Sequence, residues 1–124
     1  MNIAKFSFLL SGIYDFILGL VFLIAPVWAF NLVNVTPPNH WGYVTFAASM
    51  LAIFGIMFFQ IAKDPVKNRN LMPYGILLKV AYCGMTFGYY FTTGIPDIWV
   101  IFGVCDFIFL LLFILGYKKT ANVG

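Results

Sequence analysis

Apolar residues fall into four long runs along the chain, and short polar stretches separate them. The runs cover residues 6–30, 41–62, 71–92 and 98–117. None of them alternates apolar and polar residues with a period of two, which disfavours β-strands. A helix needs about 20 mainly apolar residues to cross a hydrocarbon core of about 30 Å. The pattern therefore predicts an all-α, polytopic membrane protein, an antiparallel bundle of four transmembrane helices.

Turn-forming residues lie between these runs. Pro37-Pro38 follows the first run, and Asp64-Pro65 follows the second. Residues 93–97 (Thr-Gly-Ile-Pro-Asp) predict a tight reversal, after which Asp97 is expected to cap the fourth helix. Pro26 lies inside the first run, and we expect it to kink that helix or end it early, because proline lacks the N–H that a helix needs.

The composition excludes a water-soluble fold. The chain has 124 residues, of which 63% are apolar and 9% are charged, whereas about a quarter of the residues in a soluble domain are charged. Seven basic and four acidic side chains are too few to cover a globule of 14.0 kDa. Two cysteines do not make a disulfide scaffold. We therefore expect residues 1–124 to form a single membrane domain.

The basic residues outside the runs predict the orientation. Cytoplasmic loops carry an excess of Lys and Arg, and the first and third loops have neither. The basic residues that flank the runs are Lys5, Lys63, Lys67, Arg69, Lys118 and Lys119. All of them fall on one side, so both termini are predicted to be cytoplasmic, in a cytoplasmic (inner) membrane. Trp28, Trp41 and Trp99 would then lie at the outer interface, with Tyr74 and Tyr117 at the inner one.

Two other interpretations, a cleaved signal peptide at the N-terminus and a nucleic-acid-binding protein, are disfavoured. The first apolar run is longer than the core of a cleaved signal peptide, and no clear small-residue cleavage site follows it. The net charge of +3 comes from the flanks of the runs. It is therefore interpreted as topology and contact with anionic lipid, and no nucleic-acid partner is expected.

Three ionisable residues, Asp15, Lys79 and Asp106, lie well inside the runs. Each costs about 2.5–3.5 kcal/mol at the centre of a membrane helix. With a rise of about 1.5 Å per residue, all three fall at a similar depth near the midplane, so a bundle could bring them together. Lys79 can neutralise one aspartate, and the other, without an evident partner, is expected to hold a proton.

Small and polar residues accompany these charges at helical spacing. Ser7, Ser11 and Gly19 share a face with Asp15, and Gly75 and Cys83 share one with Lys79. Small residues let helices approach closely, so the first, third and fourth runs are expected to surround a polar centre. The side chains expected to support this centre are Ser11, Tyr14, Tyr82 and Cys83.

Other chemistry is weakly represented. Cys83 and Cys105 form no CxxC pair and are interpreted as packing residues. His40 has no acidic or thiol companion nearby, so no metal site is expected. No phosphate-binding loop and no Ser-His-Asp set can be assembled, and no catalytic residue is assigned. Asp64 is interpreted as a turn residue beside basic neighbours, with a role at a cytoplasmic mouth as the alternative.

The chain resembles the DoxX-like superfamily of small four-helix membrane proteins over nearly all of its length. The matching features are Gly12-x-x-Asp15, Gly19, Pro26, Asp64-Pro65, Gly75-x-x-x-Lys79 and Asp106. The resemblance implies an integral bundle and, as in some relatives, an accessory role in quinone-linked oxidation or in the assembly of other membrane proteins. This chain lacks paired redox cysteines, which argues against a thiol or sulfur oxidoreductase.

Two classes of function follow from the polar centre. The first is a non-enzymatic accessory or interaction subunit, or a binder of a small hydrophobic ligand such as a quinone or a lipid, at Asp15, Lys79 and Asp106. The second is a proton-coupled transporter of small solutes that uses the same residues as a relay; an enzyme acting within the bilayer ranks third. An ion pair that only holds helices together remains the structural alternative. Expected partners are membrane lipids, other membrane-protein subunits or a second copy, and no resident cofactor is predicted.

Overall fold

The computed structural model describes residues 2–121 and is all-helical over that range, as expected. The elements are α1 (Ile3–Ile24), α2 (Pro26–Leu32), α3 (Gly42–Lys63), the short 3-10 helix η1 (Arg69–Leu71), α4 (Met72–Tyr90) and α5 (Asp97–Lys119). The remainder of the predicted 1–124 domain, Met1 and residues 122–124, lies outside the described residues.

Helices α1, α3 and α5 are long and apolar enough to cross a membrane. Helix α4 has 19 residues, contains Lys79 and four tyrosines, and is not among these three. The prediction of membrane-spanning helices is thus supported for three of the four apolar runs. The fourth crossing stays a prediction.

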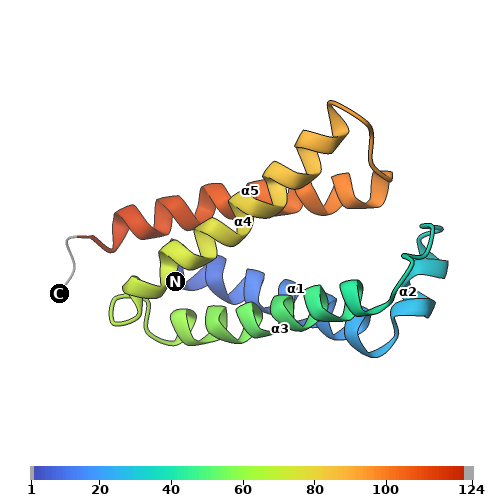
Figure 1. Cartoon of the computed structure of the whole chain (residues 1–124). Coiled ribbons are helices and arrows are strands. Elements are labelled where there is room, and N and C mark those ends of the chain that lie inside the picture. The colour runs from blue at the N-terminus through green and yellow to red at the C-terminus, as the bar shows by residue number, and fades with distance from the viewer. Residues whose placement is uncertain (1, 122–124) are drawn as a thin grey trace.

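Proline ends the first helix early. α1 stops at Ile24, and Ala25 has the non-helical dihedral angles φ −130° and ψ 57°. A new helix begins at Pro26, the position at which proline's missing N–H is harmless. The predicted break in the first run is confirmed, and it sends the chain sideways into the short helix α2 (Figure 1).

The predicted N-cap of α5, the helix of the fourth apolar run, is wrong. Pro96 occupies the N-cap position with extended dihedral angles, and Asp97 is the first residue of α5. Its side chain makes no capping hydrogen bond and is exposed. A carboxylate there still interacts favourably with the positive end of the helix dipole.

The predicted turns after α3 and after α4 are both present. Gly94 adopts φ 89° and donates its N–H to the carbonyl of Tyr89, which ends α4 and reverses the chain. After α3, the Asp64 carboxylate accepts the N–H of Lys67 at 3.1 Å. Asp64 is therefore a turn residue, as expected.

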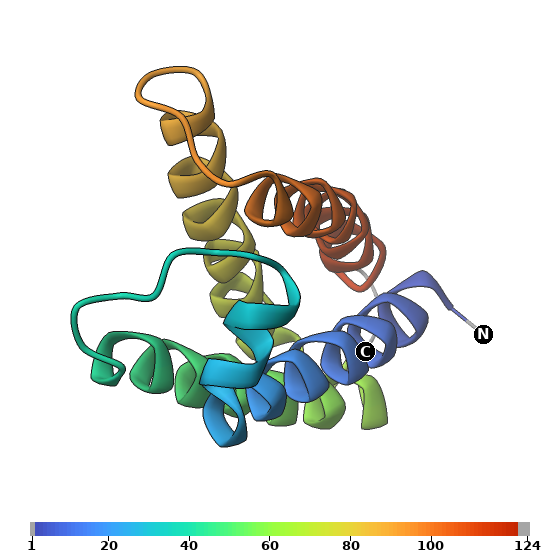
Figure 2. The ribbon, with the colours of Figure 1, turned by 90° about the vertical axis from the view of Figure 1, so that its right-hand side faces the viewer.

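The helices are arranged as two pairs. α1 packs along α3, α4 packs on α5, and α1 also contacts α5, whereas α3 and α4 contact each other little. The pairs meet at the end that holds the start of α1, the α3–α4 connection and the end of α5, which we call the closed end (Figure 1). They diverge toward α2 and the α4–α5 turn, the open end (Figures 1 and 2). The expected compact bundle is thus spread apart at one end.

Small residues bring α1 and α3 into close contact. A Cβ atom at Gly19 would lie 2.7 Å from the backbone nitrogen of Ala52 and 2.8 Å from the carbonyl oxygen of Ala48. A Cβ at Gly55 would lie 2.8 Å from the Cβ of Phe16. The two backbones therefore touch, and small residues at the contact are typical of membrane helix pairs.

Aromatic packing and one arginine hold the closed end together. The rings of Phe8 and Phe113 stack with centroids 4.0 Å apart, and Phe58 packs edge-on against both. Arg69 donates from Nε and Nη2 to the carbonyl of Tyr117 and lies 3.7 Å from the centre of its ring. Because Arg69 precedes α4 and Tyr117 lies near the end of α5, this contact ties the two helices together.

Candidate functional site

The three ionisable residues predicted to converge lie in contact. Lys79 donates from Nζ to Asp15 Oδ2 at 2.7 Å and to Asp106 Oδ1 at 3.0 Å. The exposed fractions are 0% for Lys79, 1% for Asp15 and 5% for Asp106. The predicted convergence is confirmed, and we call this group the charge triad. Its function stays a prediction.

One ammonium pairs with both carboxylates. The expectation that one aspartate lacks a partner is wrong, because Lys79 contacts both; the expectation that one of them holds a proton stays a prediction. A lysine ammonium has three N–H donors and no acceptor, so it can bridge an acid on α1 and an acid on α5 from its place on α4. The bridge makes Lys79 the residue at which the two helix pairs are joined by charge.

Helical spacing explains how α1 presents its acid. Ser7, Ser11, Asp15 and Gly19 recur every four residues and are all buried. Ser11 donates from Oγ to Asp15 Oδ2 at 3.0 Å. This hydrogen bond fixes the carboxylate on the inner face of α1, so Ser11 supports the triad as predicted.

Aromatic rings surround the ammonium of Lys79. The rings of Tyr14, Phe58, Phe109 and Phe113 have centroids 5.2–5.9 Å from Nζ. Ring faces attract cations, more strongly where water is excluded. The positive charge is thus stabilised by rings from α1, α3 and α5 as well as by the two carboxylates.

A cavity of about 660 Å³ extends from the triad toward the open end. Asp15 and Asp106 line it, whereas Lys79 does not. Ligand sites typically have volumes of about 300–1,000 Å³, mostly apolar walls and few polar groups. The size and lining of the cavity fit that description.

Aromatic side chains make up much of the cavity lining. We call this set the aromatic wall: Tyr14, Phe22, Phe30, Tyr43, Tyr82, Trp99 and Phe102. Phe30 connects α2 to the rest of the wall, because its ring centroid lies 5.9 Å from that of Phe22 and 6.0 Å from that of Trp99. The wall therefore draws residues from all five α-helices.

The cavity opens sideways, between α3 and α4. Its exposed lining residues are on these two helices: Tyr43, Ala47 and Met50 on α3, with Ala81 and Met85 on α4. Tyr43 is 68% exposed. Since α3 and α4 contact each other little, nothing among residues 2–121 closes this side.

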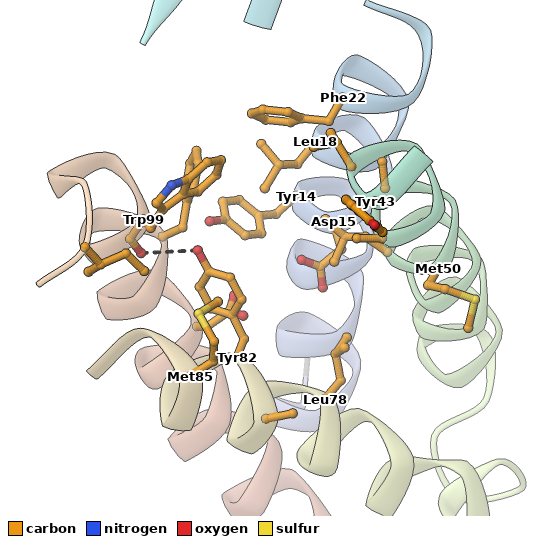
Figure 3. Close-up of a pocket in the computed structure, with 18 of the residues that line it drawn as sticks. Tyr14, Asp15, Leu18, Phe22, Tyr43, Met50, Leu78, Tyr82, Met85 and Trp99 are labelled. Carbon is orange, nitrogen blue, oxygen red and sulfur yellow. Dashed lines mark hydrogen bonds between the residues drawn. The ribbon is translucent and has the colours of Figure 1, made fainter. Parts of the chain in front are cut away.

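Tyr14 and Tyr82, two of the three tyrosines that line the cavity, differ in the hydrogen bonding of their hydroxyl groups (Figure 3). Tyr82 donates to the carbonyl of Trp99 at 3.2 Å. The hydroxyl of Tyr14 is buried and has no hydrogen-bond partner among residues 2–121. A buried phenol usually finds a partner, so the hydrogen bonding of the Tyr14 hydroxyl is incomplete.

The remaining candidate residues lie outside the cavity lining. Cys83 is buried, with Sγ 3.6 Å from the carbonyl of Gly103, so it supports the packing of α4 on α5. Cys105 is half-buried and also unpaired. His40 accepts the N–H of Gly42 through Nδ1.

Sequence reasoning missed most of the aromatic wall. Trp99 was expected only as an interfacial residue, and the phenylalanines were not singled out. Helical spacing carried the signal, because Asp15 and Phe22 are seven residues apart on α1, and Trp99 and Asp106 are seven apart on α5. Positions i and i+7 lie on one face of a helix.

Comparison of the chain with protein-family models, with curated proteins and with solved structures finds no match.

Proposed function

We propose that this chain is an integral membrane protein that takes a small hydrophobic molecule, such as a quinone or a lipid, from the bilayer into its cavity. The observation that carries the proposal is the cavity itself. It has two buried carboxylates at one end, an aromatic lining, and an opening toward the side of the helix bundle. For a chain embedded in lipid, such an opening would admit molecules directly from the membrane.

The proposal includes a fourth crossing by α4. Nineteen helical residues extend about 28 Å at about 1.5 Å per residue, close to the thickness of the hydrocarbon core. Lys79 lowers the apolar character of α4, but its charge is paired and fully buried. We further propose an inner-membrane location with both termini cytoplasmic, because the six flanking basic residues belong to the connections and termini of the closed end.

The lining favours binding over catalysis. Its polar groups are two carboxylates, three tyrosine hydroxyls and the indole of Trp99, without a serine, cysteine or histidine. Serine and cysteine are frequent enzyme nucleophiles, and histidine is the most frequent general base. An accessory role in quinone-linked oxidation, the implication of the DoxX-like resemblance, is compatible with such a binding site and stays a prediction.

Quenching of Trp99 fluorescence tests the proposal. In a variant with Trp28→Phe and Trp41→Phe, Trp99 is the sole tryptophan, and it lines the cavity. Decylubiquinone and a phospholipid with brominated acyl chains are titrated separately into the purified protein in detergent. At least one of them is expected to quench the fluorescence saturably.

A matched pair of α4 variants localises the binding. Ala81→Phe places a ring in the lining of the opening, whereas Val80→Phe places it on an exposed neighbour outside the lining. We expect Ala81→Phe to weaken quenching at least tenfold and Val80→Phe to leave it unchanged. Quenching that is absent for both probes, or equal in the two variants, would overturn the proposal.

The second candidate function is proton-coupled transport of a small solute. It is favoured by a single observation, that the cavity reaches two buried ionisable groups, Asp15 and Asp106. Solute flux in proteoliposomes that is abolished by Asp15→Asn or Asp106→Asn would support it. An accessory subunit, by contrast, would co-purify in mild detergent with a defined set of membrane proteins.

A further inference from the structure

We propose that the cavity selects lipophilic organic cations, molecules that combine a positive charge with aromatic or aliphatic bulk. This inference rests on the proposed function, because it names the class of ligand that the same cavity would take. It is argued from the charge that the cavity presents, from the atoms left free to contact a ligand, and from the character of the walls.

The charge triad contains two acids and one base. Lys79 neutralises one of the two carboxylates, so Asp15 and Asp106 together carry one surplus negative charge whenever both are ionised. A charge in a dry interior is costly unless it is paired. A monovalent cation in the cavity would balance the surplus and bring the group to neutrality.

Each acid of the triad lines the cavity and has one carboxylate oxygen without a hydrogen bond from the described residues. Both hydrogen bonds to Asp15 fall on Oδ2, and the bond from Lys79 to Asp106 falls on Oδ1. Asp15 Oδ1 and Asp106 Oδ2 therefore have no hydrogen-bond partner among residues 2–121, although both residues line the cavity. Lys79 is absent from the lining. A ligand in the cavity would thus meet the two acids and not Lys79.

The aromatic wall favours the same class of ligand. Faces of Trp and Tyr rings attract cations, and recognition of organic cations by aromatic cages uses this effect. Tyr14, Tyr82 and Trp99 lie beside the carboxylate end of the cavity (Figure 3). The unpartnered hydroxyl of Tyr14 adds a polar atom whose oxygen can also face a positive charge. An anionic ligand would be repelled by the carboxylates and would find no cation in the lining.

The volume of the cavity limits the size of the ligand, and the opening of the cavity determines its route of entry. A cavity of about 660 Å³ accommodates a ligand of drug size. Entry between α3 and α4 passes Tyr43, Ala47 and Met85, none of which is charged. The ligand must therefore be soluble in lipid, which excludes small hydrophilic ammonium compounds.

Two ions of the same shape and opposite charge test the inference. Tetraphenylphosphonium and tetraphenylborate are titrated into the protein that retains Trp99 as its sole tryptophan, with decylubiquinone as the neutral probe. Protein-free micelles give the partition baseline for each compound. We expect the phosphonium ion to bind at least tenfold more tightly than the borate ion.

Matched acid variants identify the source of the preference. Asp106→Asn leaves one acid and one base in the triad, whereas Asp97→Asn removes an exposed acid outside the cavity lining. Asp106→Asn is expected to lower phosphonium affinity at least tenfold, and Asp97→Asn to leave it within twofold. If Asp106→Asn fails to fold, comparison of the two ions on the protein with the unaltered triad still shows whether the cavity prefers the cation.

The outcomes separate this inference from the proposed function. Equal affinity for the two ions, tighter binding of the borate, or a preference that survives Asp106→Asn would overturn the inference. Quenching by decylubiquinone alone would overturn it while leaving the proposed function standing. If none of the three compounds quenches Trp99, and brominated lipid does not quench it either, both the inference and the proposed function are overturned.

Discussion

Lys79 illustrates how a buried charge is tolerated in this chain. Its ammonium is fully buried, contacts two carboxylates and lies near four aromatic rings. Removing one partner of a buried ion pair typically costs about 3–5 kcal/mol, because the remaining charge is left without compensation, whereas replacing the whole group with apolar or neutral residues is often neutral. The triad is therefore expected to behave as a unit.

Substitution of Lys79 tests this at the residue scale. Lys79→Met keeps an unbranched side chain but removes the charge that Asp15 and Asp106 share, so we expect a loss of about 3–5 kcal/mol in the free energy of unfolding. The triple variant with Asp15→Asn, Lys79→Met and Asp106→Asn is expected to recover most of that loss. The measurement is unfolding in mixed micelles, with Lys63→Met, an exposed lysine, as the control. A triple variant no more stable than Lys79→Met would contradict the cooperative triad.

The triad could be predicted from the sequence, whereas of the aromatic wall only Tyr14 and Tyr82 were predicted near it. Ionisable residues are rare in the apolar runs, and counting residues placed Asp15, Lys79 and Asp106 at one depth. Phenylalanine occurs 15 times in the chain, on every face of the helices, so its occurrence does not single out a cavity. The double contact of Lys79 was also missed, because it depends on the angle between helices that the sequence does not specify.

At the scale of elements, the contact between α1 and α3 depends on the absence of side-chain atoms. Gly19 and Gly55 face the partner backbone or Cβ at distances below 3 Å from where a methyl group would lie. In lipid there is little hydrophobic drive for helices to associate, so close packing must supply the stability. The glycines are thus required by the packing of neighbouring helices and not by a turn.

Two glycine-to-alanine substitutions with opposite surroundings test this point. Gly19→Ala places its methyl group against backbone atoms of Ala48 and Ala52, which cannot move without separating the helices. We expect it to destabilise the protein by about 1–3 kcal/mol, the usual cost of overpacking. At Gly84 of α4, a Cβ would meet no described atom within 4 Å, so Gly84→Ala should not destabilise. Equal effects in thermal unfolding in detergent would show that α1 and α3 are not tightly packed.

Element boundaries were predictable where a single residue decides them. Pro26 ends α1 because it cannot supply an N–H, and the break lies where it was expected. The cap of α5 was assigned to the wrong residue because Pro96 can itself hold the extended N-cap conformation, which moves Asp97 one position into the helix. The tilt between the two helix pairs arises from many contacts at once, and no local pattern specifies it.

At the scale of the whole molecule, the two ends differ in both packing and charge. The closed end has the aromatic core of Phe8, Phe58 and Phe113 and the Arg69–Tyr117 contact. The open end has the α4–α5 turn and the broken first run, with the cavity beneath them. Basic residues flank the helices at the closed end alone. If that end faces the cytoplasm, the triad is accessible from the opposite half of the bilayer.

Labelling of single cysteines tests that orientation. In a chain with Cys83→Ala and Cys105→Ala, a cysteine is introduced at Asn39, in the exposed loop at the open end, or at Asn70, exposed at the closed end. A maleimide that cannot cross membranes should label Asn39→Cys in intact cells, and Asn70→Cys only after permeabilisation, because Lys63, Lys67 and Arg69 retain their connection in the cytoplasm. Labelling in the reverse order would place the cavity opening toward the cytoplasmic leaflet. Labelling of both positions in intact cells would mean that α3 does not cross the membrane.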